Sequence, residues 1–525
     1  MLLLLLTIVF RMIVLPVEFE DRGFAQTQDR LHAEVAEVQR YFDRQYGGTQ
    51  SFRFDLAPAV RLPRPLAWYG ANFPGQRDLH LGDAVREAGL AASEAGVDLR
   101  SYDMLCLLYP GPGEDNGGGE DDIWPQLGRL SAHGIDRYIA CPAGRPGILA
   151  HEFGHALGLS DLYDTDGEAS GGTTRGLWGI SLMDEGCKGA QIPDFTAVEY
   201  EVLGLGRCDT LPKGSYKLPP LLQGHRYAKI LTDRTDECFL FEAREGGLLV
   251  YHLDRSDAPA GYCERWDSWM SARERWENDA VNDCPDHPCA RIIPARSDAA
   301  SVAEARFPQA GISSFGSDSP VPMRSWSGKS PGLALTGIRT EADGSVSFDV
   351  IEPVALTGLT VYQDAAVIRW QTAGELVPRG FELRWTDGTD SFSREMGPEA
   401  RVCTLEGLRP QTLYRFSLTV RCAEDARFSV DESLTTKVYR DGSYPYIYLN
   451  GAMRNSDGSF PAGSRLTLRV FNAIGAQQVR WFFDGEPIVP EADGSSLLTR
   501  PGTLRAQIFY ADGHSESIFK TITVR

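Results

Sequence analysis

Long hydrophobic runs are missing from this sequence. None reaches the roughly 18 apolar residues that a membrane-spanning helix requires, which excludes an integral membrane protein. Positive charge is also scarce, because 52 Lys and Arg residues stand against 72 Asp and Glu residues, for a net charge of −20. A surface this acidic repels phosphate backbones, so nucleic acid is not an expected partner. Hydrophobic residues at 42% and charged residues at 24% exclude general disorder, and 525 residues allow about three domains.

Paired CxxC motifs are absent, although the sequence has ten cysteines. Structural zinc sites built from cysteine use such pairs, so these cysteines are not expected to hold a metal. An even number of cysteines without metal spacing is typical of an oxidising compartment, where disulfides form. The alternative is ten buried free thiols in a cytosolic protein. Three pairs are candidates for disulfides: Cys284–Cys289, Cys403–Cys422 and Cys187–Cys208.

Basic residues are also missing from the N-terminus, where Met1–Phe10 (MLLLLLTIVF) resembles the apolar core of a signal peptide. No small-residue cleavage motif follows, and Arg11 interrupts the run. We expect a degraded export signal directly before the first strand of the domain, and therefore a secreted or cell-surface protein. The alternative is a single long strand from Leu2 to Glu18.

Helix and strand patterns alternate over the first part of the chain. Apolar residues at helical spacing predict a helix that stops at Gly47, and the continuous apolar run YDMLCLLYP predicts a buried strand. Expected helices cover 29–46, 82–96 and 147–159, and expected strands cover 102–110 and 137–141. This mixture predicts an α+β core over 11–210. Short alternating runs such as CFLFEAR and LLVYHLD then predict a β-rich part over 211–352.

The remaining sequence is expected to be all-β. Leu408-Arg-Pro410 followed by Tyr414 resembles the strand corner of fibronectin type III domains, with Tyr414 as the corner tyrosine, and VIRW at 367–370 predicts a strand that carries a tryptophan. We therefore expect a fibronectin type III-like domain over 353–438. The alternating runs RLTLRVF and VRWFFDG predict an immunoglobulin-like sandwich over 439–525.

One segment carries a recognisable chemistry. In the HEFGH motif, His151 and His155 are four residues apart, so both imidazoles leave the same face of a helix. That separation suits two nitrogen ligands of one tetrahedral zinc ion. Glu152 lies at the edge of the same face, where it can reach a water without binding the metal. Gly158 permits a sharp turn that brings Asp161 back as the third ligand.

Three protein ligands leave one position of a tetrahedral zinc ion open, which is typical of catalytic zinc. The alternative is an amphipathic surface helix with two solvated histidines. Apolar neighbours such as Phe153 and Leu157 instead predict a buried helix, in which two histidines and a carboxylate need a compensating role. The chain has nine histidines in total, so this placement by chance is a poor explanation.

The segment HEFGHALGLSDLYD resembles the zinc helix of the immune inhibitor A family of secreted bacterial metallopeptidases, which are zincins with an HExxHxxGxxD motif. The resemblance covers about 11–352 and rests on further motifs in the order of that family: VLPVEFEDRGF, WYGAN, GPGEDNGGGEDDIWPQ, GLWGISLMDEG, ECFLFEAREGGLLVYHLD and SWSG. It implies a zincin-like α+β fold with one catalytic Zn²⁺. The implied roles are ligands for His151, His155 and Asp161, general base for Glu152, and the Met-turn residue beneath the zinc for Met183.

These observations predict a secreted zinc endopeptidase that hydrolyses peptide bonds in protein or peptide substrates. Zinc activates a water, and Glu152 takes its proton and delivers it to the leaving amine. The C-terminal modules carry no catalytic cluster and are expected to bind a surface protein or a glycan, or to space the enzyme from a surface. The alternatives are an adhesin or binding protein with a latent or vestigial peptidase domain, which the intact Glu152 disfavours, and a zinc hydrolase that acts on a non-peptide bond.

Weaker signals surround the motif. Tyr163 and Tyr200 are each able to donate a hydrogen bond to an oxyanion, but aromatic packing is the more ordinary role for both. The acidic loop Glu114–Asp122 offers ligands for a structural Ca²⁺, although a solvated loop at the rim of the cleft is the simpler interpretation. Where the family often has an acidic calcium-type stretch, this chain has VDLRSYDML.

Overall fold

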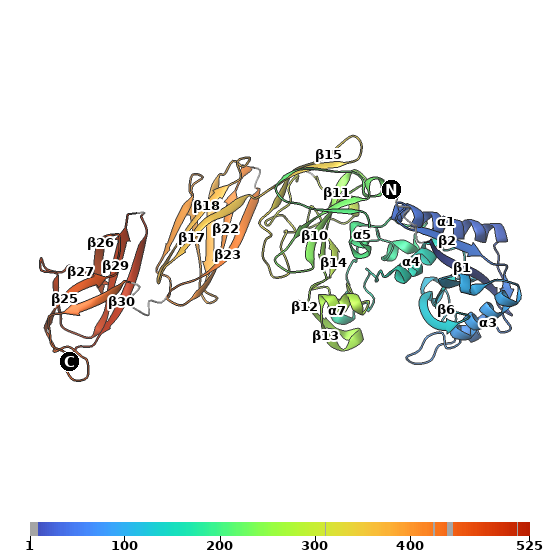
Figure 1. Cartoon of the computed structure of the whole chain (residues 1–525), viewed down its shortest axis with the longest axis horizontal. Helices are drawn as coiled ribbons and strands as arrows, with labels where there is room; N and C mark the ends of the chain where they lie inside the picture. Colours follow the sequence, from blue (N-terminus) through green and yellow to red (C-terminus); the bar gives the residue numbers. More distant parts are fainter. Residues whose placement is uncertain (1–8, 310, 424–425, 438–444, 512) are drawn as a thin grey trace, which may run out of the picture. The chain divides into compact units, whose positions relative to one another are not determined.

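The computed structural model describes residues 9–309, 311–423, 426–437, 445–511 and 513–525 (Figure 1). The chain forms two compact units. Unit 1 comprises the described residues up to 315 together with 320–331 and 335–350, and unit 2 comprises 316–319, 332–334 and 351–525. Most of the predicted export signal lies outside the described residues, and its last two residues belong to the first strand, which begins at Val9. Among the described residues, none of the helices has the length and apolarity that a bilayer crossing needs.

The first half of unit 1 is built on a mostly parallel sheet, in the order β2-β1-β4-β6-β5, with β3 beside β1. Its strands are β1 (Val9–Glu18), β2 (Ser51–Leu56), β3 (Val60–Arg61), β4 (Met104–Tyr109), β5 (Gln126–Ala132) and β6 (Ile135–Pro142). β5 alone runs antiparallel, next to β6. Since β5 is the last strand in this order, no strand of the described residues pairs with its outer edge.

Helices cover both faces of this sheet. They are α1 (Gln28–Tyr46), α2 (Leu66–Tyr69), α3 (Leu81–Glu94) and α4 (Pro146–Leu157) (Figure 1). Met12 and Val14 of β1 pack in one core with α1 and α4, whereas Ile13 and Leu15 pack in a second core with α3. Successive side chains of a strand point to opposite faces, so strands buried on both sides are apolar throughout. β4 (MLCLLY) shows this pattern and is buried at every position.

The predicted elements of this half are confirmed within two residues at each end. α1 ends where Gly47 adopts a left-handed conformation with φ of 56°, and α4 ends in the same way at Gly158 with φ of 105°. Glycine adopts this conformation without the clash that a Cβ atom causes, so both stops follow from the sequence.

The second half of unit 1 is β-rich, as predicted. It holds a five-stranded sheet (β14-β11-β10-β9-β7), a three-stranded sheet (β15-β16-β8) and the hairpin β12-β13. The strands are β7 (Arg207–Thr210), β8 (Gly214–Leu218), β9 (Arg226–Leu231), β10 (Glu237–Arg244), β11 (Gly247–Asp254), β12 (Pro259–Cys263), β13 (Ser268–Ser271), β14 (Ala290–Ile292), β15 (Ala334–Thr340) and β16 (Val346–Ile351). The helices are α5 (Ala197–Leu203), α6 (Leu221–Gly224), α7 (Ala272–Glu277) and α8 (Val302–Ala305). Leu240 and Tyr251 join the same core as α4, so the two halves share a continuous interior.

Unit 2 contains two pairs of antiparallel sheets. The first pair has the orders β17-β18-β21 and β20-β19-β22-β23, and the second has β24-β25-β28 and β27-β26-β29-β30. The strands of the first pair are β17 (Val354–Val361), β18 (Ala365–Thr372), β19 (Gly380–Thr386), β20 (Ser391–Met396), β21 (Val402–Glu406), β22 (Leu413–Arg421) and β23 (Arg427–Thr435). Those of the second are β24 (Tyr446–Asn450), β25 (Ser464–Phe471), β26 (Ala476–Phe483), β27 (Glu486–Ile488), β28 (Ser495–Leu498), β29 (Gly502–Tyr510) and β30 (Ser515–Ile522).

The corner tyrosine forms the hydrogen bond expected of it. Tyr414 is buried at the start of β22, and its hydroxyl accepts the N–H of Arg409 at 2.9 Å. Trp370, on the predicted strand, is buried in the core of the same sheet pair. Each pair of sheets in unit 2 encloses its own apolar core, so both all-β regions have the sandwich architecture that their alternating patterns predict.

The predicted disulfides are not present. All ten cysteines are free thiols, including Cys284, Cys289 and Cys422. The thiol of Cys403 is instead a hydrogen-bond acceptor for the Arg394 guanidinium at 3.5 Å. Cys187 and Cys208 are likewise free. Cys106 and Cys141, on neighbouring strands, come within 3.7 Å of each other as a thiol contact. The disulfide prediction was wrong because an even number of cysteines does not determine whether their Cβ atoms face each other in the fold.

Candidate metal centre and its cleft

α4 follows β6, the strand next to the edge strand β5, and its start is held by a buried carboxylate. Glu34 of α1 accepts the N–H of Gly144 at 2.8 Å and the N–H of Arg145 at 3.2 Å. Burial raises the pKa of Glu34, while these two backbone hydrogen bonds act in the opposite direction. Pro146 follows as the first helical residue, where its missing N–H costs nothing. The helix that carries the HEFGH motif is therefore fixed at its N-terminal end by α1.

Both histidines of the motif are oriented by backbone carbonyls. His151 Nδ1 lies 3.0 Å from the carbonyl oxygen of Leu182, and His155 Nδ1 lies 3.0 Å from that of Leu159. A carbonyl only accepts, so each Nδ1 carries the proton, and in the neutral ring each Nε2 keeps a free lone pair. This is the arrangement in which histidine binds a metal through Nε2.

Asp161 completes a group of three potential ligands. Its Oδ1 lies 3.1 Å from Nε2 of His151 and 3.4 Å from Nε2 of His155. These three atoms lie within 4.8 Å of one another, which suits the coordination of a single ion. Oδ1 is fully buried and makes no hydrogen bond of normal geometry, although the two nitrogens are close. Two nitrogens and one carboxylate oxygen are ligands that zinc prefers, so the residues fit that ion.

The charges of the three residues depend on one another. Burial alone would lower the pKa of both imidazoles, but the nearby Asp161 carboxylate outweighs it and the pKa of each is raised. Burial alone would raise the pKa of Asp161, but the two imidazoles hold it well below its usual range. The carboxylate thus remains ionised, and protons compete with a metal for the two nitrogens as the pH falls.

Glu152 lines the same cleft without joining the ligand group. It is 6% exposed, and burial raises its pKa while His151 and His155 act in the opposite direction. A carboxylate with a raised pKa is a stronger base than an exposed glutamate. The cleft has a volume of about 760 Å³ and is lined by the motif, by the start of β5 and by residues near α7.

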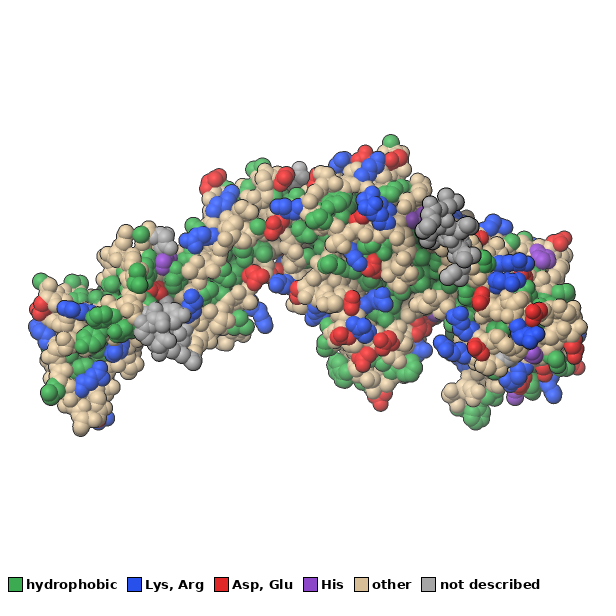
Figure 2. All heavy atoms as spheres, in the orientation of Figure 1, with side chains coloured by type: hydrophobic (Ala, Val, Ile, Leu, Met, Phe, Trp, Pro, Cys, Tyr) green, Lys and Arg blue, Asp and Glu red, His purple; other side chains and the backbone are tan. Residues whose placement is uncertain are grey.

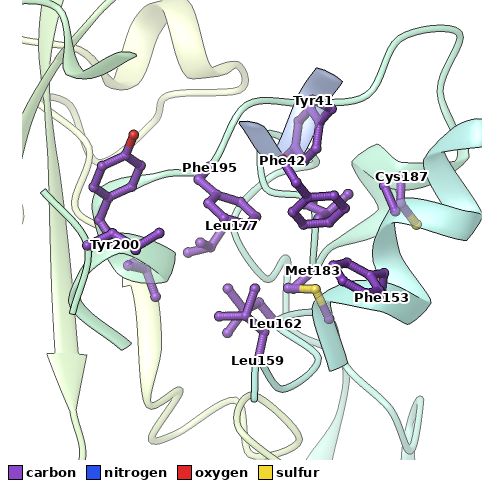
Figure 3. Close-up of a cluster of buried hydrophobic side chains, with 14 of the residues drawn as sticks. Tyr41, Phe42, Phe153, Leu159, Leu162, Leu177, Met183, Cys187, Phe195 and Tyr200 are labelled. Atoms are coloured by element: carbon purple, nitrogen blue, oxygen red, sulfur yellow. The ribbon is translucent and has the colours of Figure 1, made fainter. Parts of the chain in front are cut away.

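Met183 lies beneath α4. It is fully buried among apolar side chains that include Phe153 and Leu162 (Figure 3). Its carbonyl oxygen accepts the N–H of Leu162 at 2.7 Å, which ties this turn to the loop that carries Asp161. The helix is close-packed here, because a Cβ atom on Gly154 would lie 2.6 Å from the Met183 sulfur. Met183 therefore packs against the helix that carries His151 and His155.

Some cleft residues gave no signal in the sequence. Asp279, 118 positions from Asp161, accepts the backbone N–H of Asp161 at 2.7 Å and so fixes the ligand loop. Trp276 and Arg265 also line the cleft, from the β-rich half. Only the folded chain brings these residues to the motif, and no spacing rule predicts them.

The two tyrosines have different surroundings. Tyr163 lines the cleft, and its ring lies 6.3 Å from that of His151 in a stacked arrangement. Tyr200 is buried away from the cleft, and its hydroxyl donates to the carbonyl oxygen of Gln45 at 3.0 Å. Packing is therefore the role of Tyr200, whereas Tyr163 faces the site.

The acidic loop directs its side chains to separate partners. The Asp122 carboxylate forms an ion pair with Arg22 at 2.7 Å, and Glu114 accepts the side-chain N–H of Asn72 at 3.1 Å. A structural Ca²⁺ in this loop stays a prediction. On the face drawn in Figure 2, acidic and basic side chains are interspersed, so the net charge of −20 is not gathered in one patch there.

Residues 113–202 match the family model for the immune inhibitor A peptidase M6 catalytic domain. Immune inhibitor A of Bacillus thuringiensis subsp. alesti is 26% identical over 188 residues, which cover 26% of this chain and 26% of that protein. Pre-pro-metalloprotease PrtV of Vibrio cholerae serotype O1 is 25% identical over 198 residues, which cover 29% of this chain and 21% of that protein. The chain thus spans about a quarter of the length of these relatives. The segment matched by the family model contains the HEFGH motif, Asp161 and Met183.

Solved structures are similar over a smaller part. The fn3 domain of human collagen alpha-1(XX) chain is 24% identical and covers 17% of this chain and 83% of that domain, with a TM-score of 0.16. A score this low adds nothing to the strand order given above.

Proposed function

We propose that this chain is a secreted zinc endopeptidase. In this proposal His151, His155 and Asp161 hold the zinc, Glu152 is the general base and Met183 is the Met-turn residue. The observation that carries it is the convergence of two Nε2 atoms and one buried carboxylate oxygen in a cleft that Glu152 also lines. All five residues lie within the segment that matches the peptidase family model.

In this proposal the residues of the cleft have different roles in catalysis. A zinc ion held by the three ligands would supply a Lewis acid that polarises the scissile carbonyl and acidifies water. Glu152 accepts the proton of the attacking water and returns it to the leaving nitrogen. The carbonyls of Leu159 and Leu182 keep both imidazoles in the tautomer that leaves Nε2 free. Asp279 keeps the loop of Asp161 in place.

The edge of the sheet offers a binding site for an extended peptide. β5 begins at the cleft, where Gln126 and Leu127 line it together with Glu152. Its outer edge pairs with no strand of the described residues, so its N–H and C=O groups are available to another chain. A substrate that adds to this edge as a strand places its own backbone beside the catalytic residues.

The decisive experiment compares wild type with Glu152→Gln on peptide substrates and measures the metal content of both. We expect kcat to fall roughly 100- to 10,000-fold, because the base is lost, while zinc stays near one per chain. Glu185→Gln is the matched control, since Glu185 is exposed and forms an ion pair with Lys188. Full activity of Glu152→Gln, in a preparation free of other proteases, would contradict the proposal.

We also propose a three-domain organisation. The peptidase domain covers 11–352, with a zincin-like core over 11–210 and a β-rich part over 211–352. A fibronectin type III-like domain over 353–438 and an immunoglobulin-like domain over 439–525 follow. The strand orders of unit 2 support the two sandwiches. They are proposed to bind a surface protein or a glycan.

A further inference from the structure

A buried carboxylate lies behind one wall of the cleft. Asp78 is 6% exposed, and its φ of 49° is one that residues with a side chain rarely adopt. Its N–H donates to Asn72 Oδ1 at 2.9 Å. The amide of Asn72 in turn donates to Glu114 at 3.1 Å and to the carbonyl oxygen of Glu120 at 2.7 Å. Two loops far apart in the sequence are thereby joined around Asp78.

The carboxylate of Asp78 is directed at the start of β5. Gln126 Nε2 donates to Oδ2 at 2.6 Å, and the backbone N–H of Trp124 points at both oxygens, at 3.3 and 3.4 Å. Trp124 and Gln126 both line the cleft, and Gln126 is the first residue of β5. Among the described residues, the hydrogen-bond partners of this carboxylate are therefore groups of the cleft wall and not a basic side chain.

This placement is costly, because a buried carboxylate loses its hydration. Burial raises the pKa of Asp78 to about 7; the hydrogen bond from Trp124 opposes this effect, and the charge of Glu114 adds to it. An apolar residue would avoid that cost but would remove the acceptor of Trp124 N–H and the shorter of the two hydrogen bonds that the Gln126 amide donates. The carboxylate is therefore explained by the two donors that it binds in the cleft wall, and not by packing in the apolar core.

We propose that Asp78 is a positioning residue for the peptide substrate, which it serves by holding the start of β5 in place. The inference rests on the proposed function and adds the residue that sets the geometry of the substrate edge. Glu152 and the three ligands come from α4 and the loop after it, and Asp78 bonds to none of them. Its loss should therefore weaken substrate binding and spare the chemical step.

The test uses Asp78→Ala and Asp78→Asn in the full chain, with kcat and KM on a peptide substrate and amide hydrogen exchange over 124–132. For Asp78→Ala we expect KM to rise roughly tenfold, as for the loss of a hydrogen bond to a charged group, with kcat within about twofold. Exchange over 124–132 should become faster. Asp78→Asn should be intermediate, because its amide oxygen still accepts hydrogen bonds but carries no negative charge, and its NH2 group cannot accept one. It also replaces Asp78→Ala as the test if that variant does not fold.

Glu242→Gln is the matched control. Glu242 is a fully buried carboxylate that bonds to Ala197 N–H and Arg244, outside the cleft. This change should lower stability and leave KM unchanged. An unchanged KM in both Asp78 variants, or a fall in kcat alone, would overturn the positioning role. Wild type without peptidase activity contradicts the proposed function, whereas unchanged exchange over 124–132 contradicts the role of Asp78 by itself, so the two failures are distinguishable.

Discussion

Buried polar groups differ in kind between the cleft region of unit 1 and the sandwiches of unit 2. Around the cleft they include ionisable residues that converge on one space, such as His151, Glu152 and Asp161. In unit 2 most are hydroxyls, such as Ser464 and Thr436, which bond to nearby carbonyl oxygens. A bonded hydroxyl is inexpensive to bury, while a buried charge needs a partner or a function. Changes in the first region should therefore alter metal binding and turnover, and changes in the second only stability.

The largest effect should follow from Asp161→Ala. Removal of one of three ligands should weaken zinc binding by about 100-fold or more, since even residues that only orient a ligand account for 10–100-fold. Zinc titration against a competing chelator measures this. Glu185→Gln is again the control, because Glu185 is exposed and forms an ion pair with Lys188. An Asp161→Ala variant with undiminished zinc affinity would place the third ligand elsewhere.

A smaller effect, on protein stability, is expected where α4 packs against Met183. Gly154→Ala adds a Cβ atom 2.6 Å from the Met183 sulfur, in a fully buried position. Overpacking of this kind costs about 1–3 kcal/mol, part of which alanine regains as the better helix former. We expect a net loss of about 1–2 kcal/mol in the free energy of unfolding, measured by denaturant titration. Met183→Ala alone should also destabilise, because it leaves a cavity in the core, but the combined loss in the double variant should be smaller than the sum of the two single losses. A purely additive pair would show that the two sites do not touch.

The smallest effect tests the sandwich side of the comparison. Tyr414→Phe removes the hydroxyl that accepts the N–H of Arg409, which should cost about 1 kcal/mol in the stability of unit 2. Peptidase activity should not change. Tyr448→Phe serves as the control, because Tyr448 is 43% exposed. Loss of peptide cleavage in Tyr414→Phe with an intact unit 1 would break the distinction between the two regions.

Local patterns predicted much of this molecule. The helix stop at Gly47 and the buried strand β4 depend on neighbouring residues, so they were visible in the sequence. The same holds for His151 and His155, whose spacing alone places them on one helix face.

Long-range partners were not predictable in this way. Asp279 reaches the ligand loop across 118 positions, and Asp78 reaches Trp124 across 46 positions. Both depend on how loops return to the sheet, which no periodicity records. The disulfide prediction was wrong for the same reason, because only the fold shows that Cys403 faces Arg394.

The outer edge of β5, which is unpaired within the described part of the chain, has a consequence for which substrates the proposed site would bind. An edge strand recognises the backbone of its partner, which is the same for every sequence, so most of its affinity is indifferent to side chains. In a folded protein, most backbone N–H and C=O groups already form hydrogen bonds within helices and sheets. Under the proposed function, selection at such an edge would depend on the conformation of the substrate, and unfolded or loosely structured segments should be cut before compact ones.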